Sequence, residues 1–203
     1  DDPPVEDDAQ LFGNHWGKQG IGDATVPTPR CLGVAVHLDR AFSSVAAVGD
    51  YGDGALSVVF PATSDAELGG RRPGTTWVVD EVVTIADRHQ IGVAIAGSGP
   101  GADLVEPLEK RLGADRVFVA DMSELKGACA AFYDGITESH TIFHNDDTDL
   151  NDSARGAVKR MSGDRFLWGH KQSSGDPAML EAATLALWGA GQTVTYDPLD
   201  SIL

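Results

Sequence analysis

The stretch that most constrains the fold of this chain runs from Cys31 to Asp50. Its first half alternates between two sets of side chains, Leu32, Val34, Val36 and Leu38 in one and Gly33, Ala35, His37 and Asp39 in the other. A two-residue period is that of a β-strand and places the two sets on opposite faces. The apolar pattern resumes from Phe42 to Val48, and a third apolar run at 55–60 follows a glycine-containing turn. The region therefore predicts a three-strand antiparallel meander.

After the meander, helical and strand patterns alternate along the chain. We expect helices at 76–90, 104–112, 121–136, 150–161 and 176–188, and strands at 91–96, 116–120 and 163–169. A polar loop at 61–74 precedes the first of these helices. Thr76 is expected to cap that helix, and Asp121 with Glu124 forms a capping box for the third.

This order of elements predicts an α/β protein of the RNase H-like class, in which a three-strand antiparallel meander is followed by alternating helices and parallel strands. The strand beginning at Cys31 should be central, between the Phe42 strand and the Ile91 strand. We expect eight apolar residues to be buried together: Val34, Val36, Val45, Val93, Ile95, Phe132, Leu180 and Leu187. Ligands of such sheets bind beyond the carboxyl ends of the strands. That edge receives His37, Asp39, Gly97 and Asp121.

The 203 residues are enough for one domain with an ordinary core, which we place at 31–192. Residues 1–30 are rich in proline and acidic side chains and are expected to form an arm that adds little to the core. Within this arm, Leu11, Phe12 and Trp16 are the residues expected to dock. Residues 193–203 form a C-terminal tail. Because the chain begins at Asp1 rather than Met, we expect it to be a piece of a longer protein.

The net charge of −16 disfavours a protein that grips nucleic acid with its whole surface, because phosphate binding depends on Lys and Arg. No apolar run approaches the roughly 20 residues of a membrane helix, so no membrane association is expected. Cys31 and Cys129 both lie in apolar patterns. They are expected to be buried thiols rather than a disulfide or a zinc site.

Several segments occur in a distinctive order: the turn Gly97-Ser-Gly-Pro-Gly101, Ala130-Ala-Phe-Tyr-Asp134, Phe143-His144, Gly163-Asp-Arg-Phe-Leu-Trp168, and the run from Asp176 to Trp188. With these motifs, the region from Trp77 to Gly189 resembles the C-terminal nuclease domain of large terminase subunits from tailed phages of actinobacteria. The segment Gly33–Ser44 is similar to the first hairpin of that family.

The resemblance implies a divalent-metal endonuclease that cuts DNA during genome packaging, with Mg²⁺ or Mn²⁺ held by acids of the first strand, the middle strand and the last helix. The last-helix acid corresponds to Asp176. The other two positions fall at Ala35 and near Ala96 or Gly97, none of which is acidic. The metal site is therefore expected to be a weakened one. The chain has no Gly-x-x-x-x-Gly-Lys-Ser/Thr motif, so the packaging ATPase is absent from it.

Asp39, Asp176 and His37 are the candidate metal ligands, with the two carboxylates as the candidate catalytic residues. Each has a competing structural interpretation. Asp39 next to Arg40 is also a turn-forming residue, and Asp176 before a proline is also typical of a helix N-cap. A single histidine on a strand is more often a hydrogen-bonded structural residue than a ligand.

Other polar motifs carry weaker hypotheses. His144 beside an acidic loop invites a metal interpretation, but we favour a solvated loop. The glycine turn at 97–101 lacks the dinucleotide spacing and a following lysine, so a nucleotide-binding domain is a poor interpretation. Six cations are the candidate DNA contacts: Arg71, Arg72, Lys159, Arg160, Arg165 and Lys171.

Two functions from different classes remain open. The first is a metal-dependent endonuclease that cuts duplex DNA with little sequence preference. The second is a terminase-derived domain with a degenerate metal site that docks onto DNA or the portal. Both imply double-stranded DNA, an ATPase domain and a portal as partners, and a phage protein working in the host cytoplasm.

Overall fold

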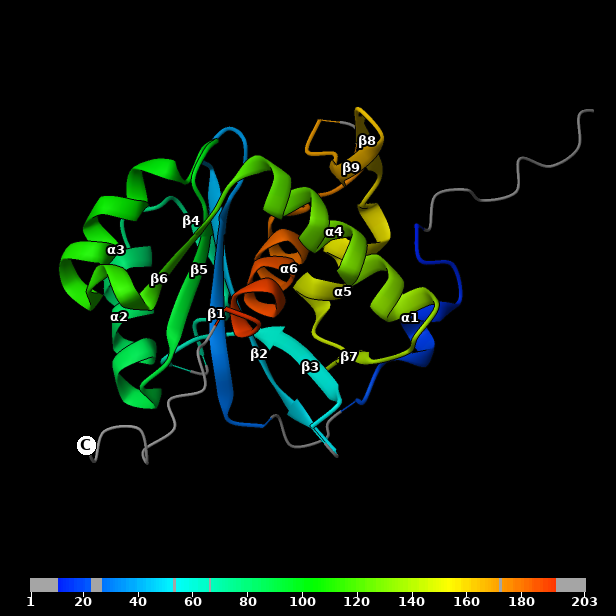
Figure 1. The fold of residues 1–203 in the computed structure, drawn as a ribbon, viewed down its shortest axis with the longest axis horizontal. Helices are drawn as coiled ribbons and strands as arrows, with labels where there is room; N and C mark the ends of the chain where they lie inside the picture. The colour runs from blue at the N-terminus through cyan, green and yellow to red at the C-terminus, as the bar shows by residue number, and fades with distance from the viewer. Residues whose placement is uncertain (1–10, 23–26, 53, 66, 172, 193–203) are drawn as a thin grey trace, which may run out of the picture.

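The computed structural model describes residues 11–22, 27–52, 54–65, 67–171 and 173–192 (Figure 1). Within them a seven-stranded sheet forms the centre of the molecule, in the order β6-β5-β1-β2-β3-β7, with β4 paired to β2. Its strands are β1 (Pro29–Val36), β2 (Phe42–Tyr51), β3 (Leu56–Pro61), β4 (Arg71–Pro73), β5 (Gly92–Ala96), β6 (Val117–Ala120) and β7 (Ile142–His144).

The pairing of these strands matches the predicted topology. Strands β1, β2 and β3 form the antiparallel meander, while β5 pairs parallel with β1 and β6 pairs parallel with β5. The strand that contains Cys31 is therefore central, between the Phe42 strand and the strand predicted at 91–96. Strand β7 extends the sheet beyond the meander by pairing parallel with β3.

The helices cover both faces of the sheet, as Figure 1 shows. One face carries α2 (Val78–His89) and α3 (Val105–Leu112), and the other carries α4 (Met122–Thr137), α5 (Thr148–Gly156) and α6 (Ala178–Ala190). Two single 3₁₀ turns occur at Ala102–Leu104 and Ala114–Arg116. A separate two-stranded hairpin, β8 (Lys159–Ser162) and β9 (Arg165–Trp168), projects at one end beside α4.

The core is divided into two layers by the sheet, so the prediction of a single buried cluster is wrong. Val34, Val36, Val45, Val93 and Ile95 pack with α2 and α3, whereas Phe132 and Leu180 pack on the opposite face. Leu187 is only partly buried against that second layer. The alternation along β1 sends its two sets of side chains into different layers, which is why they cannot meet.

The last helix packs closely against β1 at Gly33, where no side chain separates the two backbones. A Cβ atom on Gly33 would lie 1.9 Å from the carbonyl oxygen of Ala182 and 2.4 Å from the amide nitrogen of Ala186. Most of α6 is buried, as expected of a helix that is apolar on nearly every side. This close approach places the N-terminus of α6 beside the carboxyl end of β1.

Three local predictions differ from the structure. The N-cap of α2 is Trp77, with no side-chain cap, rather than Thr76. The helix predicted at 150–161 ends at Gly156, and Met161 lies in β8, because Lys159–Ser162 pairs with β9. The predicted loop at 61–74 contains β4, whose pairing with β2 needed a tertiary partner.

Part of the predicted arm packs on the domain. Helix α1 (His15–Lys18) lies beside α4, and Phe12 and Trp16 are 3% and 8% exposed in a cluster with Phe132 and Trp168. The expectation that Leu11, Phe12 and Trp16 dock is confirmed, with Leu11 partly buried against the same cluster. The expectation that the arm adds little to the core is wrong for its described part, residues 11–22. Residues 1–10 and the predicted tail at 193–203 lie outside the described residues.

His144 holds this segment in place. It is fully buried, stacks on Trp16 with ring centroids 4.1 Å apart, and its Nε2 lies 2.9 Å from the carbonyl oxygen of Trp16. Burial lowers the pKa of His144, which favours the neutral ring in this contact. The solvated-loop interpretation of His144 is therefore wrong, and its role in the structure is packing.

Candidate functional site

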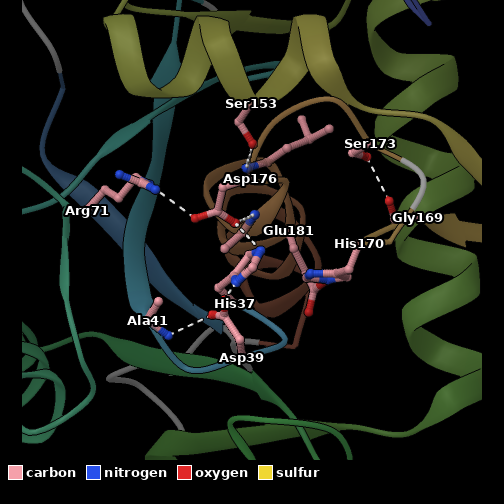
Figure 2. A network of polar contacts seen from close by, with 12 residues as sticks. His37, Asp39, Ala41, Arg71, Ser153, Gly169, His170, Ser173, Asp176 and Glu181 are labelled. Atoms are coloured by element: carbon pink, nitrogen blue, oxygen red, sulfur yellow. Dashed lines mark hydrogen bonds and ion pairs between the residues drawn. The ribbon is translucent and has the colours of Figure 1, made fainter.

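Two elements bring the predicted site residues together. The turn after β1 carries His37 and Asp39, and Asp176 lies just before α6 (Figure 2). Because α6 packs directly on β1, the end of the strand and the start of the helix meet at the carboxyl edge of the sheet. A further bond, from the Leu180 amide to Ser153 Oγ at 3.0 Å, ties the first turn of α6 to α5.

Asp176 lies one residue before the N-cap of α6, which is Pro177 and makes no side-chain cap bond, and the Asp176 side chain bonds the first turn of the helix instead. Its Oδ1 accepts a hydrogen bond from the Ala178 amide at 2.9 Å, and its Oδ2 accepts one from Arg71 Nε at 3.1 Å. The side chain is 12% exposed. Both oxygens are therefore already engaged by protein donors, although each retains a second lone pair.

His37 lies between the two predicted carboxylates. Its Nδ1 is 2.6 Å from Asp39 Oδ1, and its Nε2 is 4.0 Å from Asp176 Oδ1. The bonds of Asp39 to His37 and to the Ala41 amide lower the pKa of this carboxyl group. Asp39 is thus both a turn residue and the partner of an imidazole, and it faces Asp176 across the His37 ring.

A second imidazole–carboxylate pair, formed by His170 and Glu181, was not predicted from the sequence. His170 Nε2 lies 2.5 Å from Glu181 Oε2, and the His170 ring is 6.3 Å from the ring of His37. Burial opposes protonation of His170, but the hydrogen bond that His170 donates to Glu181 and the charges of Glu181 and Asp176 outweigh it and raise the pKa of His170. The available signal was Glu181 itself, an acid within an otherwise apolar helix pattern.

Glu181 also lines a small hollow together with Ala35 and Ala96, the two positions where the resemblance places acids. A second overlooked acid, Asp149 near the start of α5, is close enough to Asp176 to sense its charge. Burial and the neighbouring charge of Asp147 raise the pKa of Asp149, while Arg71 opposes this shift. The position of Asp149 depends on how α5 packs at the edge of the sheet, and no local sequence motif predicts that packing.

The corner formed by His37, Asp39 and Asp176 offers few ligands for a metal ion. Among the described residues, no group of three or more His, Cys, Asp or Glu side chains is arranged to hold one. Asp39, His37 and Asp176 form a row rather than a converging set, and Ala35 and Ala96 supply no oxygen. The arrangement does not suit a two-metal centre. Carboxylate oxygens are the ligand type that Mg²⁺ and Mn²⁺ prefer, but here they belong to two side chains on opposite sides of the His37 ring.

The six predicted DNA contacts fall into two groups. Arg71 and Arg72 are committed internally, since Arg71 pairs with Asp176 and Arg72 Nη2 lies 2.7 Å from Glu81 Oε1. The other four lie on the β8–β9 hairpin or just after it. Lys159 Nζ sits over the rings of Tyr133 and Phe166, at 3.3 and 4.5 Å from their centroids.

The remaining three cations, Arg160, Arg165 and Lys171, are exposed. Within the part of the chain that the structure describes, none of them makes an ion pair or a side-chain hydrogen bond. Of the six predicted contacts, these three are still available to an anionic partner.

Other predicted features are structural. Asp121 and Glu124 form the expected capping box of α4, with both reciprocal bonds present. Cys31 and Cys129 are buried free thiols, and burial raises the pKa of each to about 12. The turn at 97–101 leads from β5 into a 3₁₀ turn and α3, as a tight strand-to-helix connection. No described helix has both the length and the apolar character needed to cross a membrane.

Solved structures share this fold. The large terminase nuclease from thermophilic phage G20c with bound cobalt matches 90% of this chain and 97% of its own, with a TM-score of 0.62 and 12% identity. The large terminase nuclease domain of Thermus phage P74-26 matches 87% of this chain and 93% of its own, with a TM-score of 0.52 and 12% identity.

The large terminase of thermophilic bacteriophage D6E matches 87% of this chain but 44% of its own, with a TM-score of 0.58 and 10% identity. No protein-family model and no curated protein sequence matches the chain. The predicted RNase H-like architecture is confirmed, and it is the fold found in phage terminase nucleases.

Proposed function

We propose that this chain, which has the fold of phage large terminase nuclease domains, is a metal-dependent endonuclease domain of a phage DNA-packaging terminase. The observation that carries the proposal is the placement of Asp176. It lies at the start of the last helix, against the carboxyl end of the central strand, where the resemblance expects a metal-binding acid. Similar nucleases have been solved with bound cobalt and bound magnesium.

Asp176 and Asp39 are proposed to hold one Mg²⁺ or Mn²⁺ ion, with His37 as a further ligand, which requires the His37 ring to leave its place between the two carboxylates. Such an ion supplies a polarised phosphate and an activated water. The protein's own residues fix the geometry of the corner, because Arg71 and the Ala178 amide hold the Asp176 carboxylate in one orientation. Asp39 and Asp176 are the proposed catalytic residues.

Duplex DNA is the proposed substrate, cut with little sequence preference. The hairpin cations Lys159, Arg160, Arg165 and Lys171 are the proposed phosphate contacts, and Arg71 and Arg72 could join them only by leaving their internal partners. The remaining partners are an ATPase domain and the portal of the packaging motor, in the host cytoplasm. The nuclease unit is proposed to be residues 31–192, supported by the docked segment 11–22.

A second function is favoured by a specific observation at the same corner. Ala35 and Ala96 offer no ligand, and both oxygens of Asp176 accept hydrogen bonds from the protein. A domain of this kind would bind DNA or the portal without cutting. The two functions share the fold and differ in whether a metal ion can be held.

Nicking of supercoiled plasmid in the presence of Mn²⁺ distinguishes the endonuclease from the docking domain. The wild-type chain should nick slowly, and Asp176→Asn should not nick, because Asn keeps the helix cap but loses the charge. Asp121→Asn is the matched control, since Asp121 caps α4 at the same edge of the sheet. Ala35→Asp with Ala96→Asp should raise the rate. Equal nicking by wild type and Asp176→Asn would refute the metal assignment, and a wild type that binds DNA without nicking would favour the docking domain.

A further inference from the structure

A cleft of about 330 Å³ opens between the glycine turn at 97–101 and the β8–β9 hairpin, next to the corner described above. Its walls are largely apolar and include Leu38, Met122 and Leu167. Leu38 and Met122 are 45% and 44% exposed, which is unusual for large apolar side chains. The volume is at the lower end of the range of small-molecule sites, about 300–1,000 Å³.

One side of the cleft is formed by the His170–Glu181 pair. Glu181 carries a carboxylate that can accept hydrogen bonds from N–H groups. His170 connects the cleft to the candidate metal corner, because its ring is 6.3 Å from that of His37. A ligand in the cleft would therefore lie beside Asp39 and Asp176.

The cleft is also lined by two cations, Arg160 and Lys171. Both are exposed, and neither has a carboxylate partner among the described residues. In a chain with a net charge of −16, two unpaired cations beside an apolar cleft form a local complement to an anion with an apolar part.

We propose that this cleft binds a single unpaired nucleotide of a DNA strand, an inference that rests on DNA being the substrate. The chemistry of a nucleotide matches the three parts of the lining. The base would contact the apolar wall, its N–H groups would reach Glu181, and the flanking phosphates would meet Arg160 and Lys171. The nuclease would thereby favour DNA with a frayed or single-stranded segment next to the cutting corner.

The test measures binding by fluorescence anisotropy, with the full chain in EDTA so that no metal ion contributes. Three probes are compared: a blunt duplex, the same duplex with a short single-stranded extension, and the same extension made of abasic sites. The last two carry equal numbers of phosphates and differ in the bases alone. We expect the extension with bases to bind about tenfold more tightly than the abasic extension.

A matched pair of variants locates the effect. Leu38→Ala/Met122→Ala removes two exposed apolar side chains from the cleft, and it should abolish most of the tenfold preference. Leu68→Ala/Met161→Ala removes two that are similarly exposed, at 50% and 63%, but do not line the cleft. This control should keep the preference.

Three outcomes would overturn the inference. Equal binding of the base-containing and abasic extensions, with the blunt duplex still bound, would refute the cleft site while leaving the proposed function intact. Loss of the preference in both double variants would place the base elsewhere. Failure to bind any of the three DNAs would overturn the inference and the proposed DNA substrate together.

Discussion

The corner formed by His37, Asp39 and Asp176 and the cleft beside the β8–β9 hairpin are neighbours that differ in how their charged side chains are paired. At the corner, Asp176 pairs with Arg71, and Asp39 pairs with His37. At the cleft, Arg160 and Lys171 have no acidic partner within the described part of the chain. At the corner the Asp176 carboxylate is paired with an arginine, whereas at the cleft two cations are open to solvent.

This difference indicates where each kind of ligand can enter. A cation approaching the corner must compete with Arg71, which already neutralises Asp176. An anion approaching the cleft meets two cations that need not break an internal ion pair first. Binding of DNA and binding of metal are therefore expected to depend on different residues, even though the regions are separated only by His37 and His170.

The largest expected effect comes from displacing α6, because this helix holds both the corner and the cleft in place. Gly33→Val would place side-chain atoms where the backbone of α6 now lies, 1.9 Å from a hypothetical Cβ. We expect a loss of about 3 kcal/mol or more of unfolding free energy, measured by urea denaturation, because the helix must shift. A loss below about 1 kcal/mol would mean that α6 does not hold the two regions in place.

Removing a cation should lower the unfolding free energy more at the corner than at the cleft. Arg71→Ala leaves the mostly buried Asp176 carboxylate without its cation and should cost about 2 kcal/mol. Arg160→Ala removes an exposed, unpaired side chain and should change stability by less than about 0.5 kcal/mol. Equal urea midpoints for the two variants would contradict the claim that Arg71 is paired with Asp176 while Arg160 has no partner.

DNA affinity should show the reverse order. Arg160→Ala/Lys171→Ala should weaken binding to a blunt duplex about tenfold, about 1.4 kcal/mol, and reduce the slope of log K against log salt by about 2. Arg71→Ala, tested in EDTA, should leave both quantities nearly unchanged. If Arg71→Ala weakens binding as much as the double variant, Arg71 is a phosphate contact rather than a partner of Asp176.

The smallest expected effect is a pH dependence of stability that arises from His170, between the corner and the cleft. Glu181 raises the pKa of His170 above its ordinary value of 6.5 in the folded state. A raised pKa stabilises the fold fully below the ordinary value, and the contribution is lost as the pH rises through the folded-state value. His170→Gln should therefore cost more stability at about pH 6 than at about pH 9.

Glu181→Gln removes the carboxylate that raises the pKa of His170, so it should lose the same pH-dependent part of the stability. Urea denaturation of the wild type, His170→Gln and Glu181→Gln at the two pH values measures this part of the unfolding free energy. A cost of His170→Gln that is constant, or that grows with pH, would contradict the pairing of His170 with Glu181.

The fold was largely predictable because its signals are local. Alternation along 32–39, the capping box at Asp121 and the helical spacing after Asp176 each specify an element, and handedness and crossover rules then arrange the sheet. Errors arose where a segment takes its structure from a distant partner. Lys159–Ser162 forms a strand because it pairs with β9, and His144 is buried because Trp16 stacks on it.

The candidate site was predictable only in part. Asp176 and His37 were expected at one edge, and the structure brings them together. The pairing of Arg71 with Asp176 joins β4 to α6 across 105 residues, and that of His170 with Glu181 joins the hairpin's end to α6. Neither has a short sequence motif, because both depend on how α6 lies across the strands.

The most direct test of the central claim is the effect of Mn²⁺ on the melting temperature of the wild-type chain and of Asp176→Asn. Stabilisation follows RT ln(1 + [L]/Kd), so a weak site with few oxygen ligands should respond only at millimolar Mn²⁺. We predict that the wild type shows this late response and that Asp176→Asn, which retains the helix cap, shows none. An identical Mn²⁺ response in both proteins would contradict the assignment of Asp176 as the metal-binding acid.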